Sequence, residues 1–391
     1  MPFYKKTVLL AWELGEGLGH LPPLKAIALG LQPYGVRPVF ALRDTVGTRA
    51  ALASVEAEIL PAPFWPKPSP PPALSYSYAD ILAGNGYGAA ETARTLIAGW
   101  DALIDQVKPD LVVCEHAPGA ALAAFGRVRV ALVGNGFVVP PADGEAFAAY
   151  EPGRGEPGRQ GPVLGALQEA FAELNRAPPA SICEAFRGAF RGVYSYPELD
   201  TYGHVRRETV LGPIEAPPAL TPLPATRQVF FYSTSDLAMI DALSHSVMEV
   251  GPQARVYFRG SPGARAAVLR SRGVRVDGDA PELATVLPQA SVVFSHGGSG
   301  FSNAALASGR PQIIYPRHYE ARSTARALQA LGCGICIDPF AGGLFRAAAE
   351  RAHGDKAMRE AAQRAGAAAQ GFVARSQALE VTLRALLALL A

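Results

Sequence analysis

The sequence predicts an α/β protein with two doubly wound parallel sheets, one in each half of the chain. Short apolar runs of strand length alternate with amphipathic or alanine-rich helical stretches, which is typical of βα units in a parallel sheet. The alternation stops at a proline-rich segment over residues 212–227 and then begins again. With 391 residues and a 49% apolar content, the chain can bury two sizeable cores.

The N-terminal half begins with an apolar run at residues 7–12, followed by a glycine-rich turn that ends at His20. The expected strands are 7–12, 36–42, 111–114 and 128–133, and the expected helices are 22–31, 89–107 and 117–125. The stretch 61–72 is too rich in proline for either element, so we expect an exposed or ligand-facing loop there.

The C-terminal half repeats the pattern. Its expected strands are 229–232, 255–258, 274–276, 291–295, 312–315 and 334–337. We therefore expect an N-terminal domain over 1–211, a linker over 212–227, a C-terminal domain over 228–372 and a C-terminal helix over 373–391. The leucine-rich end of that helix favours docking on the protein's own core, with packing back on the N-terminal domain as one option, over contact with a membrane.

One segment, residues 291–311, carries the strongest functional signal. A short apolar strand is followed by the turn His296-Gly-Gly-Ser-Gly300 and by a short helix that Gly309 and Pro311 bring to an end. Glycines let the backbone approach an oxyanion, and the amide groups at a helix start point toward it. The turn is therefore a candidate phosphate-binding loop, although a glycine-rich turn can also occur without a ligand.

Composition and charge exclude several classes of protein. The net charge is +2 and the basic residues are scattered, which does not favour a nucleic-acid partner. No apolar run is long enough to span a bilayer and the N-terminus lacks a secretory pattern, so we expect a cytoplasmic protein without stable membrane insertion. The four cysteines do not indicate a disulfide framework, and Cys333-Gly-Ile-Cys336 lacks the second ligand pair of a zinc site, so no metal is expected.

Several motifs together resemble the family 1 glycosyltransferases, which have the GT-B fold and include macrolide and flavonoid glucosyltransferases. The turn at His296 with the following Leu306-x-x-Gly-x-Pro311 resembles their donor-binding signature. Gly19-His20-Leu-Pro-Pro23 resembles their Gly-His-x-x-Pro motif, and Leu211-Gly-Pro213 resembles the Gly-Pro before their linker. The resemblance implies two Rossmann-like domains facing a cleft, with the acceptor bound by the N-terminal domain and the donor by the C-terminal domain.

The resemblance also implies roles for individual residues in a metal-independent, inverting transfer from a nucleotide diphosphate sugar. His20 corresponds to the general base, and Glu115 stands where relatives often carry an acidic residue that orients it. The implied donor-binding residues are His296, Gly297, Gly298, Ser299, Gly300, Ser302 and Glu320. The acceptor would be a hydroxyl group of a small molecule or a lipid, and no separate cofactor is implied.

Elementary chemistry is consistent with these roles. A hydroxyl group is a poor nucleophile at neutral pH, and an imidazole can take its proton during attack. A carboxylate on the second ring nitrogen would orient the imidazole, and the sequence leaves Glu115 and its neighbour His116 as alternatives for that position. His20 could instead pack the turn, and Glu320 could be a solvated loop carboxylate. Glu13 and Glu16 flank the first loop, where they could contact an acceptor or face water.

Three departures from the family pattern bear on the function. Phe301 replaces a hydroxyl residue, Ala304 stands where many relatives have a ribose-binding glutamate, and Ala321 replaces a glutamine. A regulatory GT-B-like binding protein with a degenerate donor site is therefore an alternative, and a nucleotide-sugar epimerase is a less favoured one. The sequence leaves open the sugar, the nucleotide base (UDP, TDP or GDP), the acceptor and the oligomeric state.

Overall fold

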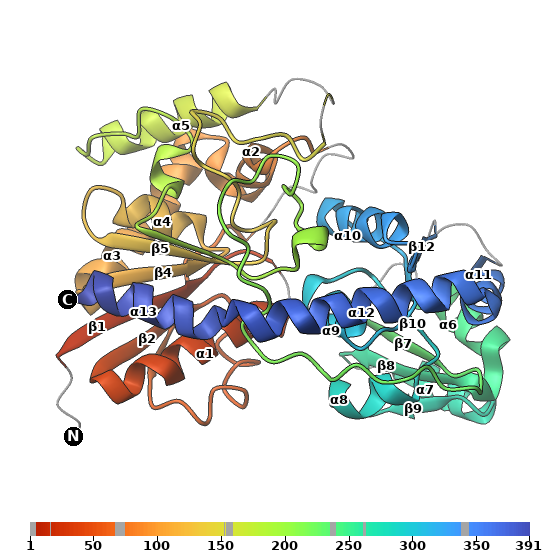
Figure 1. The fold of residues 1–391 in the computed structure, drawn as a ribbon. Helices are drawn as coiled ribbons and strands as arrows, with labels where there is room; N and C mark the ends of the chain where they lie inside the picture. Colours follow the sequence, from red (N-terminus) through yellow and green to blue (C-terminus); the bar gives the residue numbers. More distant parts are fainter. Residues whose placement is uncertain are drawn as a thin grey trace. The chain divides into compact units, whose positions relative to one another are not determined.

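The computed structural model describes residues 5–15, 17–66, 75–151, 153, 159–234, 240–260, 263–337 and 344–391 (Figure 1). The chain forms two compact units. Unit 1 comprises Met1–Tyr194, Tyr202–Glu215 and Gln377–Ala391, and unit 2 comprises Ser195–Thr201 and Ala216–Ser376.

Unit 1 is built on a parallel six-stranded sheet in the order β3-β2-β1-β4-β5-β6. Its strands are β1 (Lys6–Trp12), β2 (Val36–Leu42), β3 (Glu58–Pro61), β4 (Leu111–Glu115), β5 (Arg129–Gly134) and β6 (Phe190–Val193). Its helices are α1 (Leu21–Leu31), α2 (Tyr78–Leu82), α3 (Ala90–Val107), α4 (Pro118–Ala124), α5 (Gln160–Glu173) and α13 (Ala378–Leu390).

Unit 2 is built on a second parallel six-stranded sheet in the order β12-β11-β10-β7-β8-β9. Its strands are β7 (Val229–Thr234), β8 (Ala254–Arg259), β9 (Arg275–Asp277), β10 (Val292–Ser295), β11 (Gln312–Ile314) and β12 (Gly334–Cys336). Its helices are α6 (Ile240–Val250), α7 (Ala264–Ser271), α8 (Leu283–Val286), α9 (Ser299–Ala307), α10 (Tyr319–Ala330), α11 (Leu344–Gly354) and α12 (Lys356–Ser376).

The two sheets share one topology. Numbered within its own unit, each sheet has the strand order 3-2-1-4-5-6, in which the chain changes direction between strands 1 and 4. In sheets of this kind ligands bind at the carboxyl ends of the strands at this switch point. The switch point lies between β1 and β4 in unit 1 and between β7 and β10 in unit 2. The predicted fold of two doubly wound α/β domains is confirmed.

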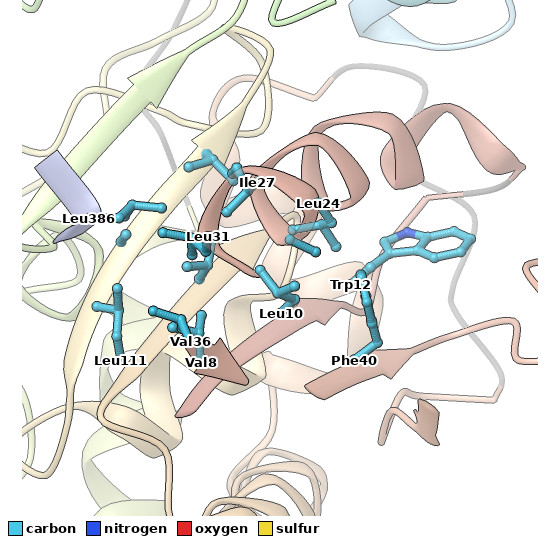
Figure 2. Packing of buried hydrophobic residues seen from close by; sticks show 14 of the residues in the cluster. Val8, Leu10, Trp12, Leu24, Ile27, Leu31, Val36, Phe40, Leu111 and Leu386 are labelled. Carbon is cyan, nitrogen blue, oxygen red and sulfur yellow. The ribbon is translucent and has the colours of Figure 1, made fainter. Parts of the chain in front are cut away.

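The core of unit 1 shows why these residues form these elements. Leu24, Ile27 and Leu31 lie three or four residues apart, so they share one face of α1 and pack on the sheet (Figure 2). The central strand β1 is buried from Val8 to Trp12, as expected of a parallel strand covered on both faces. Leu386 of α13 belongs to the same cluster, and α13 contacts α1.

The predicted strands are all present, but β3 and β6 were not predicted. Both are short, lie at the two edges of their sheet and are only partly buried. An edge strand lacks the continuous apolar run that marks a buried parallel strand, so its signal is weak. No helix within the described ranges combines the length and the apolarity needed to cross a bilayer.

Candidate active site

His20 and Glu115 come together at the switch point of unit 1. The Nδ1 atom of His20 lies 2.7 Å from the Oε2 atom of Glu115. Glu115 is the last residue of β4 and pairs in register with Trp12, the last residue of β1. His20 ends the short 3-10 helix Leu18–His20, which follows the glycine-rich turn after β1. The side chain of His20 is 17% exposed and that of Glu115 is 4% exposed, so solvent reaches the imidazole and hardly reaches the carboxyl group.

Two residues of the preceding strand and turn hold the imidazole in place. The indole of Trp12 stacks on the His20 ring, with centroids 5.5 Å apart and planes 22° apart. A Cβ atom on Gly15 would lie 2.2 Å from the Nε2 atom of His20, and Gly15 has a φ of +86°. Only glycine permits both this close approach and this backbone conformation. Trp12 lies at the end of the apolar run predicted at residues 7–12, and no sequence signal singled out Gly15.

His116, the alternative partner, does not take the position beside the His20 nitrogen. Its ring is buried and its centroid lies 5.6 Å from that of His20. The backbone of His116 is left-handed, with a φ of +47°, which turns the chain sharply directly after Glu115. Of the two neighbours, Glu115 is the one whose carboxyl group bonds to His20. Glu16, the second carboxyl residue of the first loop, lies outside the described residues.

The predicted anion loop lies at the switch point of unit 2. It connects β10 to α9, and Gly298 occupies the N-cap position of α9 without offering a side-chain cap. Gly297 has a φ of +85°, and a Cβ atom there would lie 2.8 Å from Ile314 Cγ2 and 3.1 Å from the Ala321 carbonyl oxygen. Glycine is therefore required at position 297 by sterics alone.

His296 is mostly buried and its surroundings are basic. Burial is the main cause that lowers the pKa of His296 to about 4, and the nearby His318, Arg317 and Arg259 contribute to the same shift. Its Nδ1 atom has no hydrogen-bond partner among the described residues. A neutral imidazole can donate one hydrogen bond, and the cationic groups that oppose its protonation would attract an anion.

The other predicted donor residues differ in their surroundings. Gly300 is exposed, and no atom lies within 4 Å of a Cβ atom built on it. Ser299 is partly exposed at the first position of α9, whereas Ser302 is fully buried and its Oγ atom has no partner among the described residues. Glu320 lies in the first turn of α10, which contacts the loop through Ala321 and Gly297.

The three departures from the family pattern are buried within unit 2. The ring of Phe301 stacks on Tyr232 at 4.6 Å, with the planes 8° apart. Ala304 and Ala321 are also buried. The aromatic ring at position 301 therefore belongs to the core of unit 2.

Part of the C-terminal half and the whole fold resemble known proteins. Residues 268–385 match the family model described as the C-terminal domain of erythromycin biosynthesis protein CIII-like proteins. A stretch of 53 residues is 49% identical to the elloramycin glycosyltransferase ElmGT of Streptomyces olivaceus, and this stretch covers 14% of each protein. The solved structure of CalG4, the calicheamicin glycosyltransferase, aligns with a TM-score of 0.68 at 18% identity, covering 98% of each chain.

The fold is GT-B. The glycosyltransferase VinC in complex with DTDP also aligns, with a TM-score of 0.66 at 16% identity over 98% of this chain and 99% of that chain. The resemblance to GT-B glycosyltransferases that the motifs indicated is therefore confirmed. In this GT-B chain, His20 and Glu115 occupy the switch point of one Rossmann-like unit and the loop at His296 occupies that of the other.

Proposed function

We propose that this GT-B protein is an inverting, metal-independent glycosyltransferase that uses His20 as general base. Its substrates would be a nucleotide diphosphate sugar and a small molecule with a free hydroxyl group. The observation that carries the proposal is the hydrogen bond between His20 and Glu115 at the switch point of unit 1. The likeness to natural-product glycosyltransferases supports the same reaction class.

The geometry of the pair supports Nε2 of His20 as the atom that acts as base. A carboxylate oxygen can only accept a hydrogen bond, so Nδ1 of His20 donates to Glu115 and Nε2 keeps its lone pair. Nε2 would take the proton of the acceptor hydroxyl as its oxygen forms a bond to the anomeric carbon. Glu115 would stabilise the imidazolium that results.

The loop of unit 2 supports the other half of the reaction. As the bond between the anomeric carbon and the diphosphate breaks, negative charge grows on the leaving group. The positive end of the α9 dipole and the neutral imidazole of His296 would stabilise that charge. Glu320 would bond to hydroxyl groups of the sugar. Because the structure of VinC contains DTDP, TDP-sugars are the first donors to test, followed by UDP- and GDP-sugars.

The acceptor would be a small natural product, since ElmGT is named for elloramycin and CalG4 for calicheamicin. A pocket of about 440 Å³ in unit 1 has a volume typical of ligand sites and is a candidate for its apolar part, although neither His20 nor Glu115 is among its lining residues. Trp65 forms an aromatic wall, and Gly84, Gly86 and Thr92 contribute to the lining. Acceptor binding there would change the fluorescence of Trp65, and Trp65→Phe would remove that change.

The deciding experiment uses the purified full chain with a panel of TDP-, UDP- and GDP-sugars and candidate acceptors. His20→Ala should lower turnover by at least about 100-fold, since general-base catalysis contributes ~10²–10⁴. Calorimetric titration should show unchanged nucleotide binding in the same variant, because the donor loop belongs to unit 2. Undiminished turnover in His20→Ala would remove this residue from the mechanism.

The non-catalytic alternative rests on Phe301, Ala304 and Ala321, whose apolar side chains cannot bond to a donor. It predicts weak or absent nucleotide binding by the wild-type chain. Transfer or donor hydrolysis by the purified protein, absent in His20→Ala, would exclude it.

A further inference from the structure

The carboxyl group of Glu13 is buried close to the turn that follows Glu115. Glu13 directly follows β1 and is 0% exposed. Its Oε2 atom accepts a hydrogen bond from the backbone N–H of Gly119 at 2.6 Å, and its Oε1 atom shares a hydrogen bond with the hydroxyl of Tyr87. The mechanism proposed above assigns no role to any of these groups.

The contact with Gly119 supplies an acceptor for an amide group at the start of α4, where no neighbouring side chain provides one. Gly119 is the second residue of α4, and Ala117 at the N-cap has no side chain that can cap the helix. The first amide groups of a helix have no partner within it, and an acidic or polar side chain normally accepts from them. Glu13 performs this capping from a different part of the chain.

A second hydrogen bond, from the residue after Glu13, holds the start of the turn between β4 and α4. The backbone N–H of Leu14 donates to the carbonyl oxygen of His116 at 2.9 Å. Residues 13 and 14 therefore hold the turn between β4 and α4 at His116 and at Gly119. A left-handed backbone such as that of His116 is uncommon outside glycine, and it persists only where the surroundings impose it.

We propose that Glu13 is a positioning residue: by capping α4 it fixes the turn between β4 and α4, and thereby the direction in which Glu115 presents its carboxylate to His20. The inference rests on the proposed function for its effect on turnover, but the contact between His20 and Glu115 can be measured without any reaction.

The packing around the cap leaves little freedom for another arrangement. A Cβ atom on Gly119 would lie 2.3 Å from the Tyr87 hydroxyl and 2.5 Å from Trp100 Cδ1. Burial raises the pKa of Glu13 to about 8, against the opposing effects of Tyr87, the Gly119 N–H and Arg43. The carboxyl group is therefore largely protonated at neutral pH, and glutamine is a close substitute for it.

The test compares four variants of the full chain: Glu13→Ala, Glu13→Gln, Tyr87→Phe and Arg176→Gln. The last is the matched control, because Arg176 Nη2 bonds to the carbonyl oxygens of Ala123 and Phe125 at the opposite end of α4. It weakens the same helix without touching the turn. Steady-state kinetics, thermal unfolding and the downfield proton resonance of the His20 Nδ1–H group are recorded for each, with His20→Ala identifying the resonance.

Glu13→Ala is expected to lower kcat by about 10- to 100-fold with little change in the donor KM, because a small misplacement of a catalytic group has an effect of this size. Glu13→Gln should restore kcat to within about 3-fold of wild type, since its amide oxygen can accept from Gly119. Arg176→Gln should keep kcat within about 2-fold of wild type, although it should lose about as much thermal stability as Glu13→Ala. Tyr87→Phe, expected to lower kcat about 3- to 10-fold, carries the test if Glu13→Ala does not fold.

The downfield resonance separates this inference from the proposed function. It should disappear in Glu13→Ala and persist in Glu13→Gln and Arg176→Gln. If it persists in a folded Glu13→Ala protein, or if Arg176→Gln loses kcat equally, the positioning role is wrong. If the resonance behaves as expected but His20→Ala keeps its turnover, the positioning role stands and the proposed general base does not.

Discussion

The Nδ1 atom of His20 lies 2.7 Å from the Oε2 atom of Glu115, although 95 residues separate the two in sequence. The pair forms because β1 and β4 are neighbours in the sheet and end in register at Trp12 and Glu115. The glycine-rich turn after β1 then places His20 next to the carboxyl ends of β1 and β4. The first prediction concerns this contact.

Glu115→Gln should lower kcat by about 10²–10⁴-fold, since an amide can hold the imidazole in the wrong tautomer and cannot stabilise its charged form. The measurement is steady-state kinetics with a saturating donor. Asp101→Asn is the control, because Asp101 is a carboxylate of unit 1 that bonds to Arg127 and Arg176 instead. Equal losses in the two variants would contradict the assigned role of Glu115.

Gly15→Ala should displace the His20 ring, because a methyl group there would meet Nε2 at 2.2 Å. We expect kcat to fall by about 10- to 100-fold, with nucleotide affinity unchanged. Gly126→Ala is the matched control: Gly126 has a similar positive φ of +71°, but no atom lies within 4 Å of its Cβ position. Gly126→Ala therefore introduces the same backbone strain as Gly15→Ala, but its methyl group does not clash with any other residue. A similar loss of kcat in both variants would mean that strain, and not displacement of His20, is responsible.

Binding of a nucleoside diphosphate should raise the pKa of His296 from its value of about 4. An anion beside the ring favours the charged imidazolium, so the shift is upward and could reach about 1–3 units. Histidine NMR titration with and without TDP measures it. His353 is the internal control, because its pKa is also lowered by burial but it lies on α11. An unchanged pKa of His296 at saturating TDP would contradict the proposed diphosphate contact.

Gly300→Ala and Gly297→Ala should separate binding from stability at the same loop. Gly300 is an exposed residue of α9 with open space around its Cβ position, so its substitution should not lower thermal stability and should weaken TDP binding about 10-fold by crowding the ligand. Gly297→Ala should destabilise the chain by about 1–3 kcal/mol, because its φ is +85° and three atoms lie within 3.1 Å of the added carbon. Unimpaired TDP binding by Gly300→Ala would move the anion site away from this helix start.

Glu13 should make stability depend on pH. Its pKa is about 8 in the folded chain, mainly because of burial, and about 4.5 when unfolded. At a pH between these two pKa values, Glu13 is deprotonated in the unfolded chain but still protonated in the folded chain. The free energy of unfolding should therefore fall as pH rises, by up to about 1.4 kcal/mol per pH unit from this group.

Glu13→Gln cannot ionise and should remove that part of the dependence. Urea denaturation at pH 5, 6, 7 and 8 measures the difference between the two proteins. The stabilising contribution is fully present below the unfolded pKa and is lost as pH approaches the folded value. Parallel curves for wild type and Glu13→Gln would show that Glu13 does not retain its proton in the folded chain.

The sequence by itself determined the fold class and where to look for the site. Central strands such as β1, β4, β7 and β10 are buried on both faces, so each is an apolar run that stands out from its neighbours. The glycine-rich turns that follow β1 and β10 are equally visible, because tight backbone approach requires glycine. These signals are local, and they single out His20 and His296 without any information on tertiary contacts.

Only the tertiary structure decided which side chains meet. Glu115 and His116 are adjacent in sequence and both could orient an imidazole, but the register of β1 with β4 and the left-handed backbone at His116 place Glu115 against His20. The cap that Glu13 provides depends on a contact with Gly119, which is far away in the chain. The need for glycine at position 15 depends on the approach of His20 across the turn. Contacts of this kind arise from packing geometry, which no local pattern of residue types encodes.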